Sequence, residues 1–134
     1  MDCVFCKIVA GEIPGAKVYE TDEVLAFLDI NPVHPGHTLV IPKKHYANIE
    51  EAPAEVLSQV ISAVKKVGLA LKIGLNYQGY NVTENNDPVA GQLIAHLHFH
   101  VIPRFEGDGL KLWPQRQYSA GELEATAEKL KKVL

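Results

Sequence analysis

The sequence lacks several features that would place it in common functional classes. Its 134 residues carry 13 Lys and Arg against 16 Asp and Glu, so the basic excess typical of a nucleic-acid-binding surface is missing. No apolar run approaches the roughly 20 residues of a transmembrane helix, and the charged residues Asp2, Lys7 and Glu12 interrupt the segment where a signal peptide would be apolar. We therefore expect a soluble, cytoplasmic protein that binds neither nucleic acid nor membranes.

Glycine-rich nucleotide motifs and a disulfide framework are also missing. Neither G-x-G-x-x-G nor a Walker lysine motif occurs, which excludes the usual dinucleotide-binding and P-loop sites. Cys3 and Cys6 are too close together for a useful structural disulfide, but C-x-x-C spacing suits a metal or redox pair. Because there are no repeats and no long linker, residues 1–134 are predicted to form one domain of ordinary globular composition.

Hydrophobic periodicity predicts an α+β domain built on an antiparallel sheet of about five strands. The strands are expected at residues 17–20, 24–29, 37–42, 79–84 and 96–102, in meander order. Apolar residues at three- and four-residue steps predict one long helix over residues 53–73, and a short helix is expected over residues 3–10. Ser119 and Glu122 have capping-box spacing and predict a C-terminal helix.

The most informative stretch is His96-Leu97-His98-Phe99-His100, in which three imidazoles alternate with large apolar residues. Alternate side chains of a strand share a face, so the histidines are expected on one face and the apolar residues in the core. At ~3.4 Å per residue the outer histidines have Cα atoms ~13–14 Å apart, so one ion cannot bind all three. At most two neighbours could be ligands, which leaves open a metalloenzyme that uses His98 and His100.

Imidazole chemistry offers a second interpretation, in which one histidine is a nucleophile or a general base. Neutral imidazole can attack while a neighbouring imidazolium stabilises an oxyanion or protonates a leaving group. The loop before the histidine row contains Asn85 and Gly91, whose side-chain amide and accessible backbone N–H groups suit a phosphoryl group. Without the histidines, that loop would be interpreted as a plain turn.

Cys3 and Cys6 need two further ligands to hold zinc. His45 and His96 are available, and a site with two cysteines and two histidines would be closed and structural. A redox pair is one alternative, although no βαβ unit follows the C-x-x-C, and two buried thiols in a short helix are another. His34 is interpreted as a solvated loop residue rather than a ligand.

The chain resembles the histidine triad (HIT) family of nucleotide hydrolases and transferases, and is similar to its HINT-like, zinc-containing bacterial and archaeal members. The matching segments, in the same order as in the family, are residues 5–14, residues 39–45, Ala90-Gly91-Gln92, and the histidine row followed by Val101-Ile102. The resemblance implies a HIT-like fold over nearly the whole chain, a homodimer whose sheets join, and a purine nucleotide conjugate as substrate.

The resemblance also implies roles for particular residues. His98 would attack the α-phosphorus of a nucleoside phosphoramidate or a dinucleoside polyphosphate and form a covalent nucleotidyl-histidine, with His96, His100 and His37 in the same cluster. The implied nucleotide contacts are Asn85, Gly91 and Gln92 for phosphate, Asp29 for ribose, and Val4, Phe5, Ile8, Phe27 and Ile30 for the base. The implied ligands of a structural zinc ion are Cys3, Cys6, His45 and His96.

One position departs from the family pattern. Relatives often carry Ser or Thr after the glutamine of the loop, where the hydroxyl contacts phosphate, but here the residue is Leu93. A nucleotide-binding regulatory module with little turnover is therefore the alternative to an enzyme.

Overall fold

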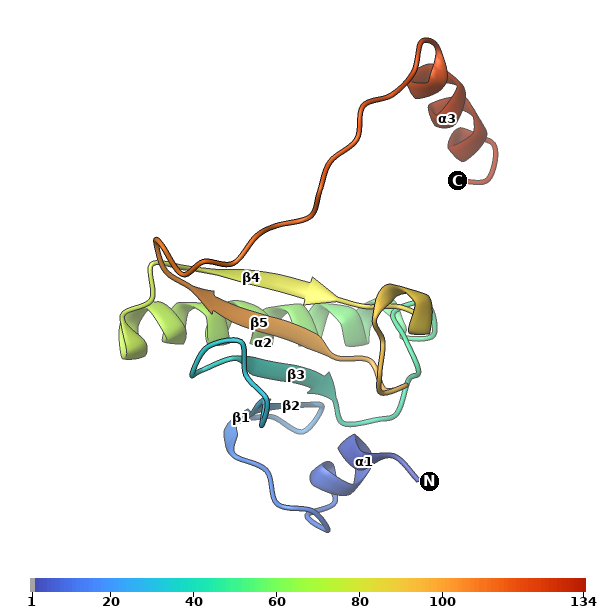
Figure 1. The fold of residues 1–134 in the computed structure, drawn as a ribbon. Coiled ribbons are helices and arrows are strands. Elements are labelled where there is room, and N and C mark those ends of the chain that lie inside the picture. The colour runs from blue at the N-terminus through green and yellow to red at the C-terminus, as the bar shows by residue number, and fades with distance from the viewer. Residues whose placement is uncertain (1) are drawn as a thin grey trace.

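The computed structural model describes residues 2–134 and contains the five predicted strands and the predicted helices (Figure 1). The strands are β1 (Lys17–Glu20), β2 (Val24–Leu28), β3 (Thr38–Pro42), β4 (Gly79–Glu84) and β5 (Phe99–Arg104). The α-helices are α1 (Val4–Val9), α2 (Ala54–Leu75) and α3 (Glu122–Lys131), and a 3₁₀ turn, η1, spans Pro88–Ala90. Every strand pairing is antiparallel, which confirms the α+β fold.

The strand order is β1-β2-β3-β5-β4, so the predicted meander is wrong after β3. The chain leaves β3 through α2, adds β4 at the edge of the sheet, and returns with β5 between β3 and β4 (Figure 1). A tight turn forces two successive strands to pair, whereas a long connection through a helix, such as the one between β3 and β4, does not. The order of the last two strands therefore follows from tertiary packing.

The sheet lies between α2 on one face and α1 on the other (Figure 1). Alternate residues of the histidine row, Leu97, Phe99 and Val101, pack into the core under α2, as the alternation predicted. The opposite face of the sheet packs against Phe5 and Ile8 of α1. The histidines therefore project from the α1 side.

The regular part of the histidine strand starts later than predicted. β5 begins at Phe99, and the preceding residues His96 to His98 lie outside the sheet, with a bend at His96. The backbone N–H of Leu97 donates to the carbonyl of Tyr46 at 2.7 Å, so this segment bonds to the loop after β3 instead of to a strand. The alternation of side chains continues through it, which preserves the predicted separation of faces.

Helix α3 stands away from the sheet at the end of an extended segment, residues 105–121 (Figure 1). The helix starts at Glu122, with Gly121 as its cap residue, so Ser119 is not the N-cap that the spacing predicted. One half of the capping box forms, because Ser119 N–H donates to the Glu122 carboxylate at 3.0 Å. Within residues 2–134, no helix combines the length and the apolarity needed to cross a bilayer.

The contact between α2 and β4 gives a first prediction. Gly68 of α2 faces the ring of Tyr80, and an added Cβ would overlap that ring. Gly68→Ala is expected to lower the free energy of unfolding by roughly 1–3 kcal/mol, because overpacking outweighs the gain in helix propensity. Urea denaturation measures the change.

Gly74 is the matched control in the same helix, because a Cβ there has no neighbour within 4 Å. Gly74→Ala is expected to raise the free energy of unfolding by about 0.5–1 kcal/mol. Equal stabilisation by both alanines would show that α2 and β4 are not closely packed at Gly68.

Candidate active site and metal cluster

A cavity of about 500 Å³ opens on the α1 side of the sheet. Its walls come from α1, from the end of β2 with the loop that follows, and from the loop before β5. The residues predicted to contact a nucleotide that line this cavity are Val4, Phe5, Ile8, Phe27, Asp29, Ile30, Asn85 and Gly91, together with His98 and His100. The fold therefore gathers them around one space.

Gln92 is placed differently from the other predicted phosphate contacts. It is buried and does not line the cavity. Its amide nitrogen donates to the Ala47 carbonyl at 2.6 Å, and its amide oxygen accepts from the Asp87 N–H at 2.9 Å. A further bond joins the Ile49 N–H to the Asn86 side-chain oxygen at 2.9 Å. These bonds brace the loop of residues 85–92 against the segment after β3.

The ring of His98 is held in one tautomer. Its Nδ1 lies 2.7 Å from the backbone carbonyl of His96, and a carbonyl can only accept, so Nδ1 carries the proton. The lone pair is then on Nε2. Phe5 packs edge-on against the ring, with centroids 5.1 Å apart, and only 8% of His98 is exposed. His98 therefore presents the lone pair of Nε2 to the cavity from a ring that is held in a fixed orientation.

His37 and His100 form a hydrogen-bonded pair beside His98, whose ring centroid is 5.1 Å from that of His100. The Val33 N–H donates to His37 Nδ1 at 3.1 Å, so the proton of His37 is on Nε2. His37 Nε2 donates in turn to His100 Nδ1 at 2.9 Å, which leaves the proton of His100 on Nε2. The backbone of the loop before β3 thereby sets the tautomer of a histidine that lines the cavity.

Burial keeps this pair neutral at pH 7 in the free protein. Burial lowers the pKa of His37, although the nearby Asp29 carboxylate opposes the shift. For His100, burial and then the charges of His98 and His37 lower the pKa to about 4. An anion in the cavity would favour the protonated form of the pair.

Asp29, His37 and His100 also lie close enough together to surround a cation. Coordination through His37 Nε2 would require the ring proton on Nδ1, where the Val33 N–H already points. The hydrogen bonds therefore suit this cluster to holding a proton. His37 itself is buried behind His100 and does not line the cavity.

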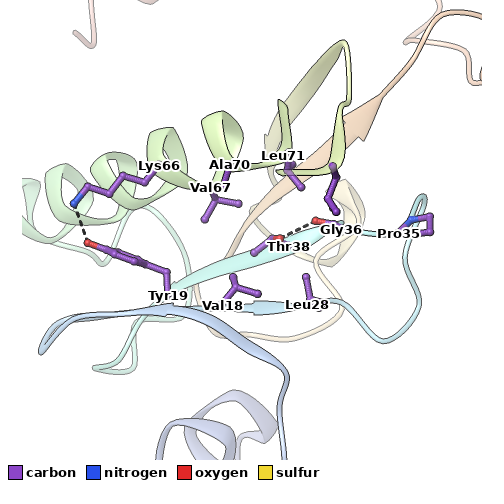
Figure 2. A pocket seen from close by; sticks show the side chains of 11 residues that line it. Val18, Tyr19, Leu28, Pro35, Gly36, Thr38, Lys66, Val67, Ala70 and Leu71 are labelled. Carbon is purple, nitrogen blue, oxygen red and sulfur yellow. Dashed lines mark hydrogen bonds between the residues drawn. The ribbon is translucent and has the colours of Figure 1, made fainter. Parts of the chain in front are cut away.

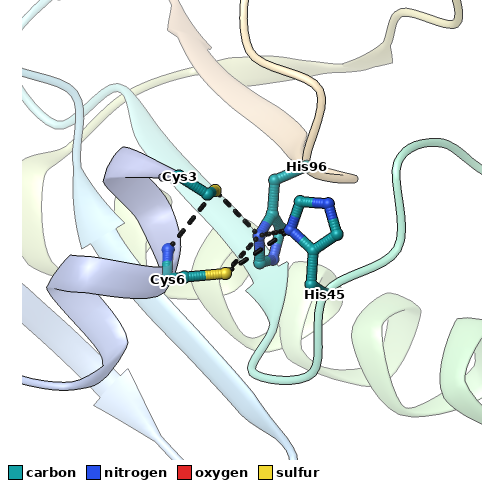
Figure 3. Close-up of side chains that lie close together, drawn as sticks. All are labelled: Cys3, Cys6, His45 and His96. Atoms are coloured by element: carbon teal, nitrogen blue, oxygen red, sulfur yellow. Dashed lines mark hydrogen bonds between the residues drawn. The ribbon is translucent and has the colours of Figure 1, made fainter. Parts of the chain in front are cut away.

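Four side chains converge at the N-terminal end of α1, and Figure 3 shows them pointing toward one another. They are Cys3 and Cys6, His45 from the loop after β3, and His96 from the start of the histidine row. The two imidazole Nδ1 atoms are 3.2 Å apart, and the sulfur to nitrogen distances are 3.4 to 3.6 Å. Tetrahedral zinc would place these pairs about 3.3 and about 3.6 Å apart.

The protonation of His96 also fits a metal ligand. Its Nε2 donates to the Pro42 carbonyl at 2.9 Å, so the lone pair of Nδ1 points toward the two thiols. Burial, and next the neighbouring Cys3, raise the pKa of the Cys6 thiol, which a cation would reverse. The two ring nitrogens of His96 thus face Pro42 and the two thiols, and neither faces the cavity. Of the histidine row, His98 and His100 line the cavity.

The prediction that His34 is a solvated loop residue is wrong. Its side chain is largely buried, with Nε2 3.2 Å from Asp108 and the ring against Phe105 at a centroid distance of 4.8 Å. Arg104 binds both oxygens of the same carboxylate, at 2.6 and 2.9 Å. These contacts join the loop that carries Val33 to the base of the C-terminal arm, a pairing between segments far apart in the chain that no local pattern indicates.

A second cavity, of about 510 Å³, lies between α2 and strands β1 to β3 (Figure 2). Its wall is mainly apolar and includes Val18, Leu28, Val67 and Leu71. The lysine in this wall, Lys66, donates to the hydroxyl of Tyr19 at 3.0 Å, as Figure 2 shows. Among the described residues of this lining there is no histidine, cysteine or carboxylate, whereas the cavity beside α1 has two histidines and Asp29.

The fold and the site define a small α+β protein in which a row of alternating histidines separates a cavity lined by His98 and His100 from a cysteine–histidine cluster. The family profile described as HIT domain matches residues 10–107, and the chain belongs to this family. The family predicted from the four sequence segments is thereby confirmed.

Relatives and solved structures agree with this assignment. The chain is 42% identical over 138 residues to a Candida albicans protein named adenosine 5'-monophosphoramidase, covering 98% of this chain and 91% of that one. A HIT family crystal structure from Bacillus subtilis superposes with a TM-score of 0.91 and 43% identity, over 100% of this chain and 98% of that one. A Zn-bound histidine triad protein from Mycobacterium smegmatis superposes with a TM-score of 0.80 and 36% identity, over 100% and 99% of the two chains.

The buried histidine pair predicts how stability depends on pH. The folded protein holds His100 neutral down to a pKa of about 4, whereas an unfolded histidine binds a proton below about pH 6.5. The free energy of unfolding is therefore expected to fall as the pH drops from about 6.5 to 4. His100→Asn should flatten this decline by on the order of 2 kcal/mol. Urea denaturation across this pH range measures it, and an unchanged slope in the variant would contradict the assignment.

Proposed function

We propose that the protein hydrolyses a purine nucleotide conjugate at its α-phosphate, through a covalent nucleotidyl intermediate on His98. The observation that carries this proposal is the fixed tautomer of His98, which leaves the Nε2 lone pair available in a cavity that Asn85 and Gly91 also line. The C. albicans relative named as a phosphoramidase supports the reaction class. A binding module would not require a nucleophile held in this way.

The cavity divides into parts that match the parts of a nucleotide. Phe5, Ile8 and Phe27 form an apolar wall for the base. Asp29, which also lines the cavity, is assigned to the ribose hydroxyls. Gly91 has φ of +94°, a conformation that favours glycine, and with Asn85 it forms the side of the cavity assigned to the phosphate.

The charge of the lining favours a phosphoramidate over a dinucleoside polyphosphate. Among the described residues that line this cavity there is no Lys or Arg, and the acidic one is Asp29. A leaving group with further phosphates would therefore meet no countercharge, whereas an amine leaves without negative charge. We accordingly assign nucleoside phosphoramidates as the substrate class.

The reaction proceeds in two displacements. Binding of the anionic substrate favours a protonated pair of His37 and His100. His98 Nε2 attacks the α-phosphorus and forms an N–P bond while the P–N bond to the amine breaks, and the protonated pair gives the amine its proton. Water then attacks the same phosphorus, the N–P bond to His98 breaks, and the proton of the water returns to the pair. The products are the nucleoside monophosphate and the free amine.

Zinc is proposed at Cys3, Cys6, His45 and His96, supported by the distances in the cluster and by the Zn-bound M. smegmatis neighbour. When bound, it supplies a structural cross-link between the N-terminal helix and the sheet. The four residues hold α1 in the position where Phe5 and Ile8 form the base wall. Zinc therefore supports the cavity without contacting substrate.

A homodimer is proposed as the working form. The C-terminal arm and α3 expose Trp113, Leu112 and Leu130, and they extend away from the body of the chain (Figure 1). A second copy is the partner that such an arm suits, since identical chains can exchange arms symmetrically.

The nucleophile gives the main test of the proposed function. His98→Ala is expected to reduce turnover of adenosine phosphoramidate by at least about 10⁴-fold, because the covalent route is lost. Mass spectrometry after rapid acid-free quenching should find one nucleotidyl adduct, on His98, in the unmodified protein. An unchanged melting temperature shows that the variant folds. Normal turnover by this folded variant, or an adduct on another residue, would refute the mechanism.

The metal cluster gives a separate test. Cys6→Ser is expected to weaken zinc binding by at least about tenfold and to lower the melting temperature, because one of four ligands is lost. Elemental analysis of purified protein measures the zinc. His98→Ala is the control and should keep the full zinc content, whereas loss of zinc in that variant would favour a metalloenzyme that uses His98 as a ligand.

A further inference from the structure

Two apolar side chains that line the nucleophile-bearing cavity are almost fully exposed, so they belong to the part of the cavity that opens to solvent, its mouth. Leu93 lines the cavity yet is 94% exposed, and Ile30, which also lines it, is 91% exposed. Leu93 therefore makes few contacts within its own chain and leaves its side chain free to pack against a molecule in the mouth.

The position of Leu93 is fixed by the loop that carries it. The preceding residue, Gln92, is anchored to Ala47 and Asp87 by hydrogen bonds of 2.6 and 2.9 Å. On the following side, Ile94 packs against the buried cluster below α1. An exposed side chain between two anchored neighbours has a defined place, so it can act as a specificity contact.

The geometry of an in-line displacement directs the leaving group toward the mouth of the cavity, where Leu93 is exposed. His98 lines the cavity and is 8% exposed, so it lies at the buried end of this space. In an in-line displacement the leaving group departs on the side of the phosphorus opposite the nucleophile. The wall formed by α1 and β2 is assigned to the base, so the open mouth remains for the departing amine. Leu93 is at the edge of that mouth.

We propose that Leu93 is a specificity-determining residue that selects phosphoramidates whose amine carries an apolar aromatic or branched alkyl group. The inference rests on the proposed function, because it assumes displacement by His98. An apolar amine would cover Leu93 and gain by removing its surface from water, whereas a polar amine would not. The selectivity acts on the first displacement alone, because the amine has left before water attacks.

The test compares two adenosine phosphoramidates whose amines have similar basicity, one from 2-phenylethylamine and one from 2-methoxyethylamine. The unmodified protein is expected to show a kcat/KM at least about tenfold higher for the phenyl compound. Leu93→Ser should reduce this ratio by about tenfold, and Leu93→Met should largely retain it. The hydrolysis rate of the His98 adduct, measured after rapid mixing, should be equal in all variants.

Val89→Ser is the matched control. Val89 is in the same loop and is 98% exposed, but it does not line the cavity, so this variant should keep the selectivity of the unmodified protein. Equal ratios in the unmodified protein and Leu93→Ser, or an equal loss in Val89→Ser, would overturn the role of Leu93. Failure of the proposed function is a different result, in which neither compound gives a His98 adduct.

Discussion

The hydrogen bond from His96 Nε2 to the carbonyl of Pro42 orients the rest of the site. Both groups are fully buried, and the 2.9 Å bond leaves Nδ1 of His96 pointing toward Cys3 and Cys6. Without this bond the imidazole could present either nitrogen to the cysteines, and the cluster would lose its geometry. The cluster positions α1, and α1 provides the apolar wall of the reaction cavity. The main-chain oxygen of Pro42, at the end of β3, thus influences the cavity wall through His96, the cluster and α1.

Backbone hydrogen-bond partners also make the three histidines of the row different from one another, because they determine which ring nitrogen carries the proton. The carbonyl of Pro42 puts the proton of His96 on Nε2, while the carbonyl of His96 puts the proton of His98 on Nδ1. The N–H of Val33 acts on His100 through His37. The alternation of a strand places the three rings on one face, but the backbone partner of each ring decides which nitrogen carries the proton. The proposed roles in metal binding, attack on phosphorus and proton transfer follow from that difference.

Much of this could be predicted from the sequence, and the exceptions share a cause. Strand alternation predicted the core positions Leu97, Phe99 and Val101, and the composition of the C-x-x-C segment with two histidines indicated the ligands that converge. The place of β5, the inward turn of Gln92 and the burial of His34 were not predictable in this way. Each depends on which distant segment meets it in space, and local periodicity carries no information about that choice. The leucine at position 93 was visible in the sequence, but its exposure required the fold.

The segment from His45 to Ile49 takes part in both sites. His45 belongs to the metal cluster, Tyr46 accepts a hydrogen bond from Leu97, and Ala47 and Ile49 hold the loop beside the phosphate position. An insertion or deletion within this short stretch would displace His45 from the metal cluster and would also displace the main-chain groups that hold the loop of residues 85–92. The length of this segment therefore matters to both sites at once, because Tyr46, Ala47 and Ile49 make these hydrogen bonds through main-chain atoms.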